Sequence, residues 1–330
     1  MSQFISKQNL TLWLRQQLDA RELVAPTQVD GLILFRRVNR IEDIVLDSQN
    51  TAISPKEWLF PKTETLFHVE RKDGRAELIP AGIERETVIF GIRPCDARGI
   101  TMLDLPYLAD PADTLYRQRR EKTILVGISC LTACPECFCE SMGSGPDDTA
   151  GLDIMLTEVQ DGYLLQLLTN KGKGLISEEL LSTTDVPKPQ APRTASVPSE
   201  GVVAKMRQAF DSPYWGRVAD RCIHCNVCAY VCPTCYCFDI RDYTNKGNVE
   251  RVRSWESCQS PGFTKIAGGH DPRANKGARM RQRFSHKLLY FPEQFGPLHC
   301  VGCGRCVRSC PVNIDIREIM QDVQRMGAPK

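Results

Sequence analysis

The sequence predicts an α+β protein, with an N-terminal α/β domain followed by a mainly helical C-terminal domain. Apolar segments typical of strands alternate with turns and helix-like stretches in the first half of the chain. A proline-rich segment without periodicity follows, and the last third contains one cysteine motif twice. We therefore expect a first domain over residues 1–182, a linker over 183–200 and a second domain over 201–330.

The first domain opens with an amphipathic segment. Over residues 8–20, leucines stand among polar side chains at a spacing that predicts a short helix. Apolar segments bounded by turn residues then predict six strands. These strands are expected at residues 31–38, 43–47, 87–93, 123–130, 153–159 and 162–169.

The second domain is expected to begin and end with helices. Residues 202–210 predict a helix that leads into the first cysteine motif. Over 313–326, Ile316, Ile319 and Val323 recur at helical spacing, which predicts a helix directly after the second motif.

Composition restricts the kinds of protein that are compatible with the chain. The 330 residues are 42% hydrophobic and 25% charged, as in ordinary globular proteins, and the net charge of +2 does not imply a nucleic-acid or membrane partner. No apolar run approaches the 18 or so residues of a membrane span, and the first twenty residues lack the features of a secretory signal. We therefore expect a cytoplasmic protein, whose sixteen cysteines favour metal binding over disulfides.

The repeated motif fits C-x2-C-x2-C-x3-C-P in both copies. Its two-residue spacers allow one tight loop to present three thiolates to a cubane cluster, and in two-cluster ferredoxins the fourth cysteine serves the other cluster. A zinc site would instead use paired C-x2-C ligands from separate hairpins. The motifs therefore predict a ferredoxin-type domain with two [4Fe-4S] clusters. The ligand sets are Cys222, Cys225, Cys228 and Cys310 for one cluster, and Cys300, Cys303, Cys306 and Cys232 for the other.

Five further cysteines follow two of the expected strands of the first domain. Because the carboxyl ends of neighbouring parallel strands meet at one edge of a sheet, these thiols are expected to lie together. We hypothesise a third [4Fe-4S] cluster there, and the alternative is buried or redox-sensitive thiols. Its ligands would be Cys95, Cys130, Cys137 and Cys139, with Cys134 as a competing ligand.

The remaining cysteines, Cys235, Cys237 and Cys258, are one short of a tetrathiolate site, so we expect them to pack near the ferredoxin pair. A long insert, residues 238–299, separates the two motifs, and long loops are usually functional. Its basic residues have few aromatic neighbours, so they predict a solvated face or a patch that docks an acidic partner, and not a nucleic-acid site. These are Lys265, Arg273, Lys276, Arg279, Arg281, Arg283 and Lys287.

Together, several segments resemble the β subunit of cytoplasmic NAD(P)-linked [NiFe] hydrogenases (sulfhydrogenases), which is close to the electron-transfer subunit of anaerobic sulfite reductase. They lie at residues 54–67, 90–100, 137–146, 232–242, 253–258, 268–273, 281–296 and 300–316. The resemblance implies a relay of electrons between a diaphorase-type flavoprotein subunit, which handles NAD(P)H, and the small and large [NiFe] hydrogenase subunits. In the sulfite reductases the corresponding subunit feeds a sirohaem subunit.

The chain shows neither G-x-G-x-x-G opening a helix nor G-x-x-x-x-G-K-S/T, which agrees with a relay that binds no nucleotide. We therefore expect a non-catalytic electron-transfer subunit of an oxidoreductase complex. The alternative is a flavin-binding reductase subunit, with its pocket near the Arg93-Pro94-Cys95-Asp96 loop.

Overall fold

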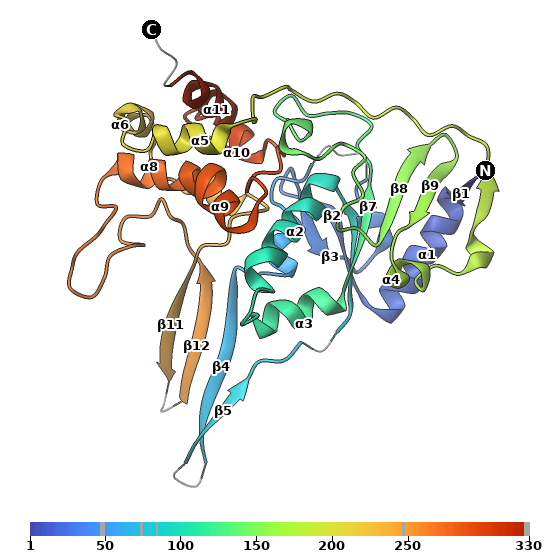
Figure 1. Ribbon diagram of the computed structural model, residues 1–330. Coiled ribbons are helices and arrows are strands. Elements are labelled where there is room, and N and C mark those ends of the chain that lie inside the picture. The colour runs from blue at the N-terminus through green and yellow to red at the C-terminus, as the bar shows by residue number, and fades with distance from the viewer. Residues whose placement is uncertain (47–49, 73–74, 84, 246–247, 327–330) are drawn as a thin grey trace.

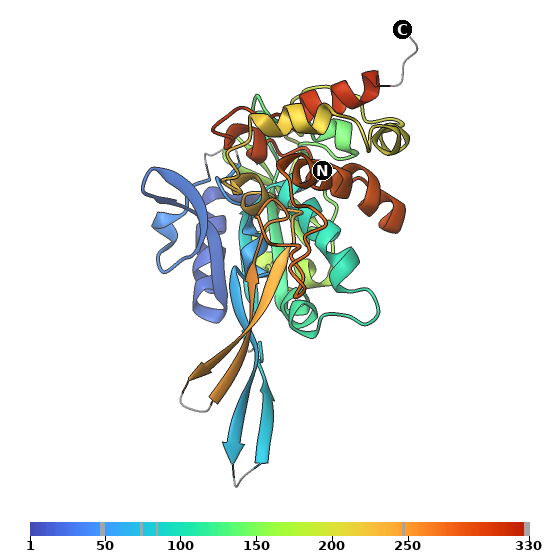
Figure 2. The ribbon, with the colours of Figure 1, turned by 90° about the vertical axis from the view of Figure 1, so that its left-hand side faces the viewer.

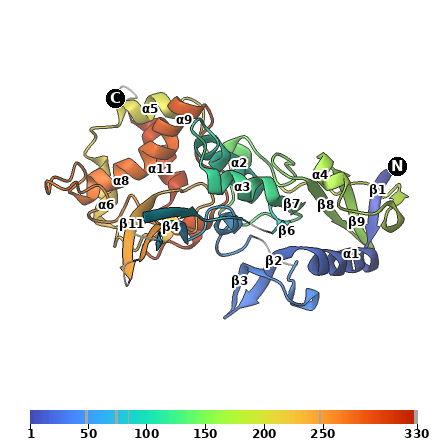
Figure 3. The same cartoon turned by 90° about the horizontal axis from the view of Figure 1, so that it is seen from below.

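The computed structural model describes residues 1–46, 50–72, 75–83, 85–245 and 248–326. A large sheet flanked by helices forms one part of the molecule, and the helices of the C-terminal part gather beside it (Figure 1). A second, smaller sheet projects away from both (Figure 2). Seen from below, the C-terminal helices lie at one end and α1 lies at the other (Figure 3). No helix in the described ranges is long and apolar enough to cross a membrane.

The large sheet has eight strands in the order β10-β1-β9-β8-β7-β6-β2-β3. Its four central strands, β8, β7, β6 and β2, run parallel, and the outer pairs are antiparallel. The strands are β1 (Ser2–Ser6), β2 (Glu22–Val29), β3 (Leu32–Arg37), β6 (Thr87–Ile92), β7 (Thr123–Ile128), β8 (Ile154–Val159), β9 (Gly162–Leu167) and β10 (Ser182–Thr184).

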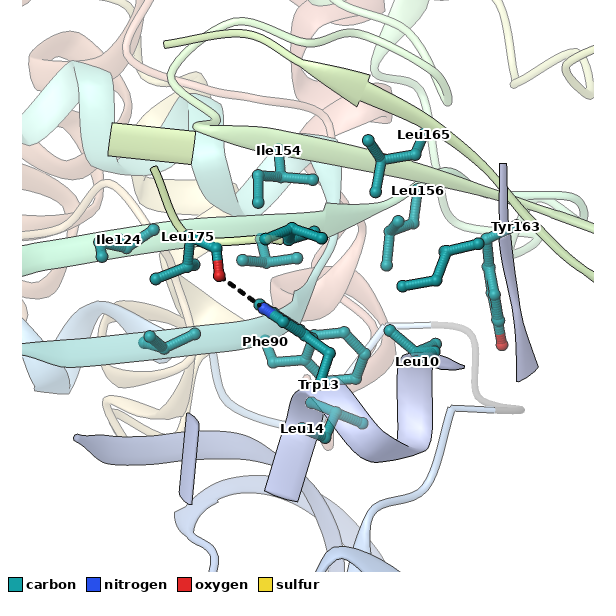
Figure 4. Close-up of a cluster of buried hydrophobic side chains, with 14 of the residues drawn as sticks. Leu10, Trp13, Leu14, Phe90, Ile124, Ile154, Leu156, Tyr163, Leu165 and Leu175 are labelled. Atoms are coloured by element: carbon teal, nitrogen blue, oxygen red, sulfur yellow. Dashed lines mark hydrogen bonds between the residues drawn. The ribbon is translucent and has the colours of Figure 1, made fainter. Parts of the chain in front are cut away.

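Helices cover both faces of this sheet. In β6, Val88 and Phe90 face the cluster that includes α1 (Lys7–Ala20), while Ile89 faces the cluster that includes α2 (Pro94–Tyr107) and α3 (Thr114–Lys122). Figure 4 shows Trp13 of α1 among these side chains, where its indole Nε1–H donates to the carbonyl of Leu175 at 3.0 Å. Burial on both faces explains the nearly continuous apolar runs of the central strands.

The smaller sheet joins segments that are far apart in the chain. Its order is β11-β12-β4-β5, and all its pairs are antiparallel. The strands are β4 (Thr63–Lys72), β5 (Arg75–Pro80), β11 (Phe238–Asn245) and β12 (Asn248–Trp255). The insert thus begins with a β-hairpin that pairs with a hairpin of the first half of the chain. The expectation of a mainly helical C-terminal domain is not confirmed, because that part contains strands as well as helices.

The helices of the C-terminal part are α5 (Val202–Gln208), α6 (Tyr214–Asp220), α7 (Val227–Tyr230), α8 (Lys276–Ser285), a π-helical turn η5 (His286–Tyr290), α9 (Phe291–Phe295), α10 (Arg305–Arg308) and α11 (Ile316–Arg325). Helices α5, α6, α8 and α11 share one hydrophobic cluster, which includes Met206, Trp215, Phe284 and Met320. Shorter helical segments elsewhere are α4 (Asn170–Lys173), η1 (Ile41–Asp43), η2 (Pro55–Trp58), η3 (Glu140–Met142) and η4 (Glu178–Leu180).

Most elements expected from periodicity are confirmed. The three helices correspond to α1, α5 and α11, and five of the six strands correspond to β3, β6, β7, β8 and β9. The strand expected at 43–47 is wrong over its described residues, and residue 47 lies outside them. Ile44 forms only an isolated bridge to Thr27, because β2 already pairs with β3 and β6. Ile41, Ile44 and Leu46 instead pack against the α1 face of the core.

Candidate metal centres

The two cysteine motifs fold into loops of the same shape. In the first loop, His224 and Asn226 have φ of 56° and 63°, and in the second loop Gly302 and Gly304 have φ of 65° and 73°. These are equivalent positions, on either side of the second cysteine of each motif. A short helix, α7 or α10, begins immediately afterwards. The left-handed residues turn each loop tightly, so that its first three thiols face one space.

One cavity, called cavity A, is lined by the first motif. Cys222, Cys225 and Cys228 line it together with Cys310 from the end of the second motif. The structure therefore brings together the four thiols of the first expected ligand set.

A second cavity, called cavity B, has the complementary lining. Cys300, Cys303 and Cys306 of the second motif meet Cys232 from the end of the first. Cys306 lines cavities A and B, so the two spaces share a wall.

The third cavity, called cavity C, has a volume of about 360 Å³ and lies in the N-terminal part. Cys95 comes from the start of α2, directly after β6, and Cys130 follows β7. The loop after β7 adds the thiols of Cys134, Cys137 and Cys139. All five cysteines singled out in this part of the sequence thus line one space at the carboxyl ends of adjacent parallel strands.

Cavity C also contacts the second motif. Gly302 and Cys303 line it, and Cys303 lines cavity B as well. The backbone N–H of Phe138 donates to the carbonyl of Gly302 at 2.8 Å, and Asn50 Nδ2 donates to the carbonyl of Cys303 at 2.7 Å. The three cavities therefore form a series in the order C, B and A.

The donor sets suit iron–sulfur clusters better than single ions. Within the described ranges, no group of three or more His, Cys, Asp or Glu side chains is placed to hold one metal ion. The thiols are instead distributed around cavity walls, four to six to a cavity, as a polynuclear cluster requires. Burial raises the pKa of Cys95 and Cys228, and it raises that of Cys300 to about 11. Deprotonation of these thiols is therefore coupled to binding of a positively charged centre.

Three basic side chains of the insert are buried, which contradicts a solvated face for them. Arg279, Arg283 and Lys287 are 7%, 4% and 2% exposed. Lys265 and Lys276 of the same insert are exposed, as expected. The signal in the sequence was the i, i+4, i+8 spacing of the buried three, which places them on one face of a helix.

A further buried cation, Lys56, comes from the N-terminal part. Its Nζ donates to the carbonyl of Cys235 at 2.8 Å and lies 4.1 Å from the centre of the Trp255 ring. Burial lowers the pKa of Lys56 to about 8. Its segment, residues 54–67, is part of the family resemblance, but nothing in the sequence had indicated that Lys56 is buried beside cysteines.

Cys235, Cys237 and Cys258, which belong to none of the expected ligand sets, lie close to the buried cations. Arg283 Nη1 is 3.9 Å from Cys235 Sγ. A hydrogen bond from the Cys237 thiol lowers the pKa of the Cys258 thiol to about 6, and Cys258 is buried. These contacts agree with packing of the three cysteines beside the ferredoxin pair.

Glycine at position 302 permits a close approach between the two parts of the chain. A Cβ added there would stand 2.5 Å from the carbonyl carbon of Phe138 and 2.6 Å from the backbone of Cys139. Gly201 has a similar left-handed φ of 67°, but no heavy atom lies within 4 Å of its added Cβ. Alanine variants at these two positions therefore separate the effect of backbone strain from the effect of steric crowding.

We expect Gly302→Ala to lower the free energy of unfolding by about 1–3 kcal/mol more than Gly201→Ala, because only the former overpacks the contact between cavities B and C. Thermal unfolding of both variants at one scan rate measures the difference. Equal destabilisation would mean that the loop around residue 138 yields to the methyl group.

Comparisons with known proteins identify the family of the chain. Residues 221–314 match the family described as the 4Fe-4S dicluster domain. The chain is 31% identical over 316 residues to sulfhydrogenase 2 subunit beta of Pyrococcus furiosus, and the match covers 91% of both chains. No solved structure matches. With this identity over nearly its whole length, and with a dicluster domain at the expected motifs, the chain belongs to the sulfhydrogenase β-subunit family.

Proposed function

We propose that this protein is the iron–sulfur electron-transfer subunit of a multisubunit cytoplasmic oxidoreductase. In this proposal it relays electrons between the small and large subunits of a [NiFe] hydrogenase and an NAD(P)H-linked flavoprotein subunit. The name of its relative, a sulfhydrogenase subunit, supports a complex of this kind. The observation that carries the proposal is the series of three thiol-lined cavities with shared walls.

The ligand sets of the two ferredoxin-type clusters follow the linings of cavities A and B. Cys222, Cys225, Cys228 and Cys310 would hold one [4Fe-4S] cluster. Cys300, Cys303, Cys306 and Cys232 would hold the other. The exchange of the fourth cysteine ties the two motifs together, so the loops would be fixed relative to each other.

A third [4Fe-4S] cluster would occupy cavity C. Cys95, Cys130, Cys137 and Cys139 are the proposed ligands, with Cys134 as the competitor, because the N-terminal part brings five thiols to the cavity, one more than a cubane needs.

When bound, such clusters store and release one electron at a time. The chain would contribute spacing and exclusion of water. Cys303 stands between cavities C and B, and Cys306 between B and A, so adjacent centres would be separated by single side chains. Ile316 lines both A and B and contributes apolar cover.

Cavity A reaches the surface at a loop suited to electron exchange with a partner. Cys225 is exposed, and Ile223 beside it is 61% exposed. We infer that one partner docks over this loop and that another docks on the side of cavity C.

The test is anaerobic purification of the complex through a tag on this chain. In this chain separated from its partners, three clusters predict about twelve irons, whereas about eight, with both ferredoxin-type clusters intact, would exclude the third cluster. The complex should contain nickel and flavin, and NAD(P)H or hydrogen should reduce the clusters, as followed by electron paramagnetic resonance. Clusters that neither reductant reduces would refute the relay.

The same preparation distinguishes the alternatives. Sirohaem in place of nickel would identify the protein as the electron-transfer subunit of an anaerobic sulfite reductase. Flavin bound to the isolated chain would favour a flavin-binding reductase subunit, with cavity C and its Arg93, Pro94 and Cys95 wall as the pocket.

A further inference from the structure

Two buried cations of the insert lie at the walls of different cavities. Arg283, near the end of α8, lines cavity A, and Lys287, in the π-helical turn that follows, lines cavity B. They are four residues apart and therefore project from one face of the same helical segment. The segment begins at Asn275, whose side-chain oxygen accepts from the N–H of Ala278 at 2.8 Å. One rigid element thus provides one cation to each cavity.

Arg283 contacts the loop of the first motif. Its Nη2 donates to the carbonyl of Cys228 at 2.9 Å, and its Nη1 lies 3.9 Å from Cys235 Sγ. Only 4% of the side chain is exposed. The guanidinium is therefore held beside one of the proposed ligands of cavity A, with little water to screen its charge.

Lys287 contacts a proposed ligand directly. Its Nζ lies 3.3 Å from Cys232 Sγ and donates to Thr234 Oγ1 at 3.0 Å and to the carbonyl of His299 at 3.2 Å. His299 immediately precedes Cys300, so the ammonium bridges the end of the first motif and the start of the second. Its π-helical turn is a rare geometry that occurs often at functional sites.

Neither cation forms a salt bridge with a carboxylate among the residues that the structure describes. Other buried cations do: Arg305 pairs with Asp96, and Arg253 pairs with Glu64. Buried charges in proteins are normally paired, because an isolated charge loses its hydration without compensation. The thiolates around cavities A and B are the negative groups that face Arg283 and Lys287.

We propose that Arg283 and Lys287 set the reduction potentials of the two ferredoxin-type clusters, Arg283 for cavity A and Lys287 for cavity B. The inference rests on the proposed function, since it needs a cluster in each cavity. Reduction adds one electron, supplied by the flavoprotein partner, and therefore one negative charge, with no bond formed or broken. A fixed positive charge stabilises the reduced form more than the oxidised form, so each cation raises the potential of its own cluster.

The test is a redox titration of each cluster in the full chain, followed by electron paramagnetic resonance. Arg283→Met and Lys287→Met remove one charge each. Arg281→Met is the matched control, because Arg281 lies on the same helix but bonds to the carbonyl of Phe210 and to the exposed Asp211. Arg283→Lys and Lys287→Arg keep the charge. Iron and sulfide content are measured for every variant.

We expect each methionine variant to lower the equilibrium constant for reduction of its own cluster about tenfold, or about 59 mV for a one-electron couple. The other cluster, the control and the charge-retaining variants should shift much less. If one methionine variant loses iron, the reduction potential measured in the other variant tests the inference.

Shifts no larger than that of Arg281→Met would overturn the inference, and so would equal shifts in the charge-retaining variants. Loss of iron from both methionine variants would also overturn it, because the cations would then serve assembly. A wild-type chain that lacks two cluster signals would instead refute the proposed function, so the two failures are distinct.

Discussion

A Cys232→Ser variant is expected to lose about four irons per chain and to lose the cluster of the second motif, although Cys232 belongs to the first. The reason is that the Cys232 thiol lines cavity B with Cys300, Cys303 and Cys306. By the same argument, Cys310→Ser should remove the cluster of the first motif, because Cys310 lines cavity A. Iron and sulfide analysis gives the loss, and electron paramagnetic resonance identifies the remaining cluster.

Pairs of variants make this prediction specific. If the fourth ligands are exchanged, the spectrum of Cys232→Ser should match that of Cys300→Ser, and Cys310→Ser should match Cys225→Ser. A match between Cys232→Ser and Cys225→Ser would show that each motif holds its own cluster. Cys258→Ser is the control, because this thiol is buried in the same region but belongs to neither ligand set.

Each cavity is lined by the cysteines that the sequence had grouped, because most of the signal for the grouping is local; their role as cluster ligands stays a prediction. Spacing within each motif determines the loop, and the strands before Cys95 and Cys130 are clear from their apolar runs. The resulting linings of all three cavities follow from short-range geometry and from the adjacency of β6 and β7.

The smaller sheet could not be predicted in this way. β12 pairs with β4 nearly two hundred residues earlier, with Ser254 opposite Thr63. Charged residues interrupt these strands, as in Phe238 to Asn245, so their pattern resembles a solvated segment. Local sequence patterns do not reveal strand pairing over such a distance. For the same reason, they did not reveal that Lys56 lies beside the cysteines.

Buried cations were missed for a related reason. The periodicity of Arg279, Arg283 and Lys287 defines a helical face, but it does not reveal what the face contacts. A charged face usually meets solvent, whereas this one meets thiols. Only the three-dimensional structure shows whether a charged helical face contacts solvent or thiols.

The largest effect on stability is expected at the buried ion pair between the two parts of the chain. Arg305 donates to both carboxylate oxygens of Asp96, at 2.6 and 2.8 Å, and to the carbonyl of Thr51 at 2.7 Å. Both charged side chains are fully buried. Arg305→Met leaves the Asp96 carboxylate buried without its partner, so we expect a loss of about 3–5 kcal/mol in the free energy of unfolding.

The appropriate control removes an exposed pair. Arg241 and Asp239 are 66% and 42% exposed, and Arg241→Met should change the stability far less than Arg305→Met, because solvent screens an exposed pair. Thermal unfolding of the cluster-containing chain at one scan rate ranks the variants. A double variant, Asp96→Leu with Arg305→Met, removes both charges and should recover much of the loss, because the cost of the single variant comes from the unpaired carboxylate. If the double variant is as unstable as Arg305→Met, the lost bond to Thr51 and the altered packing, and not the unpaired charge, account for the effect.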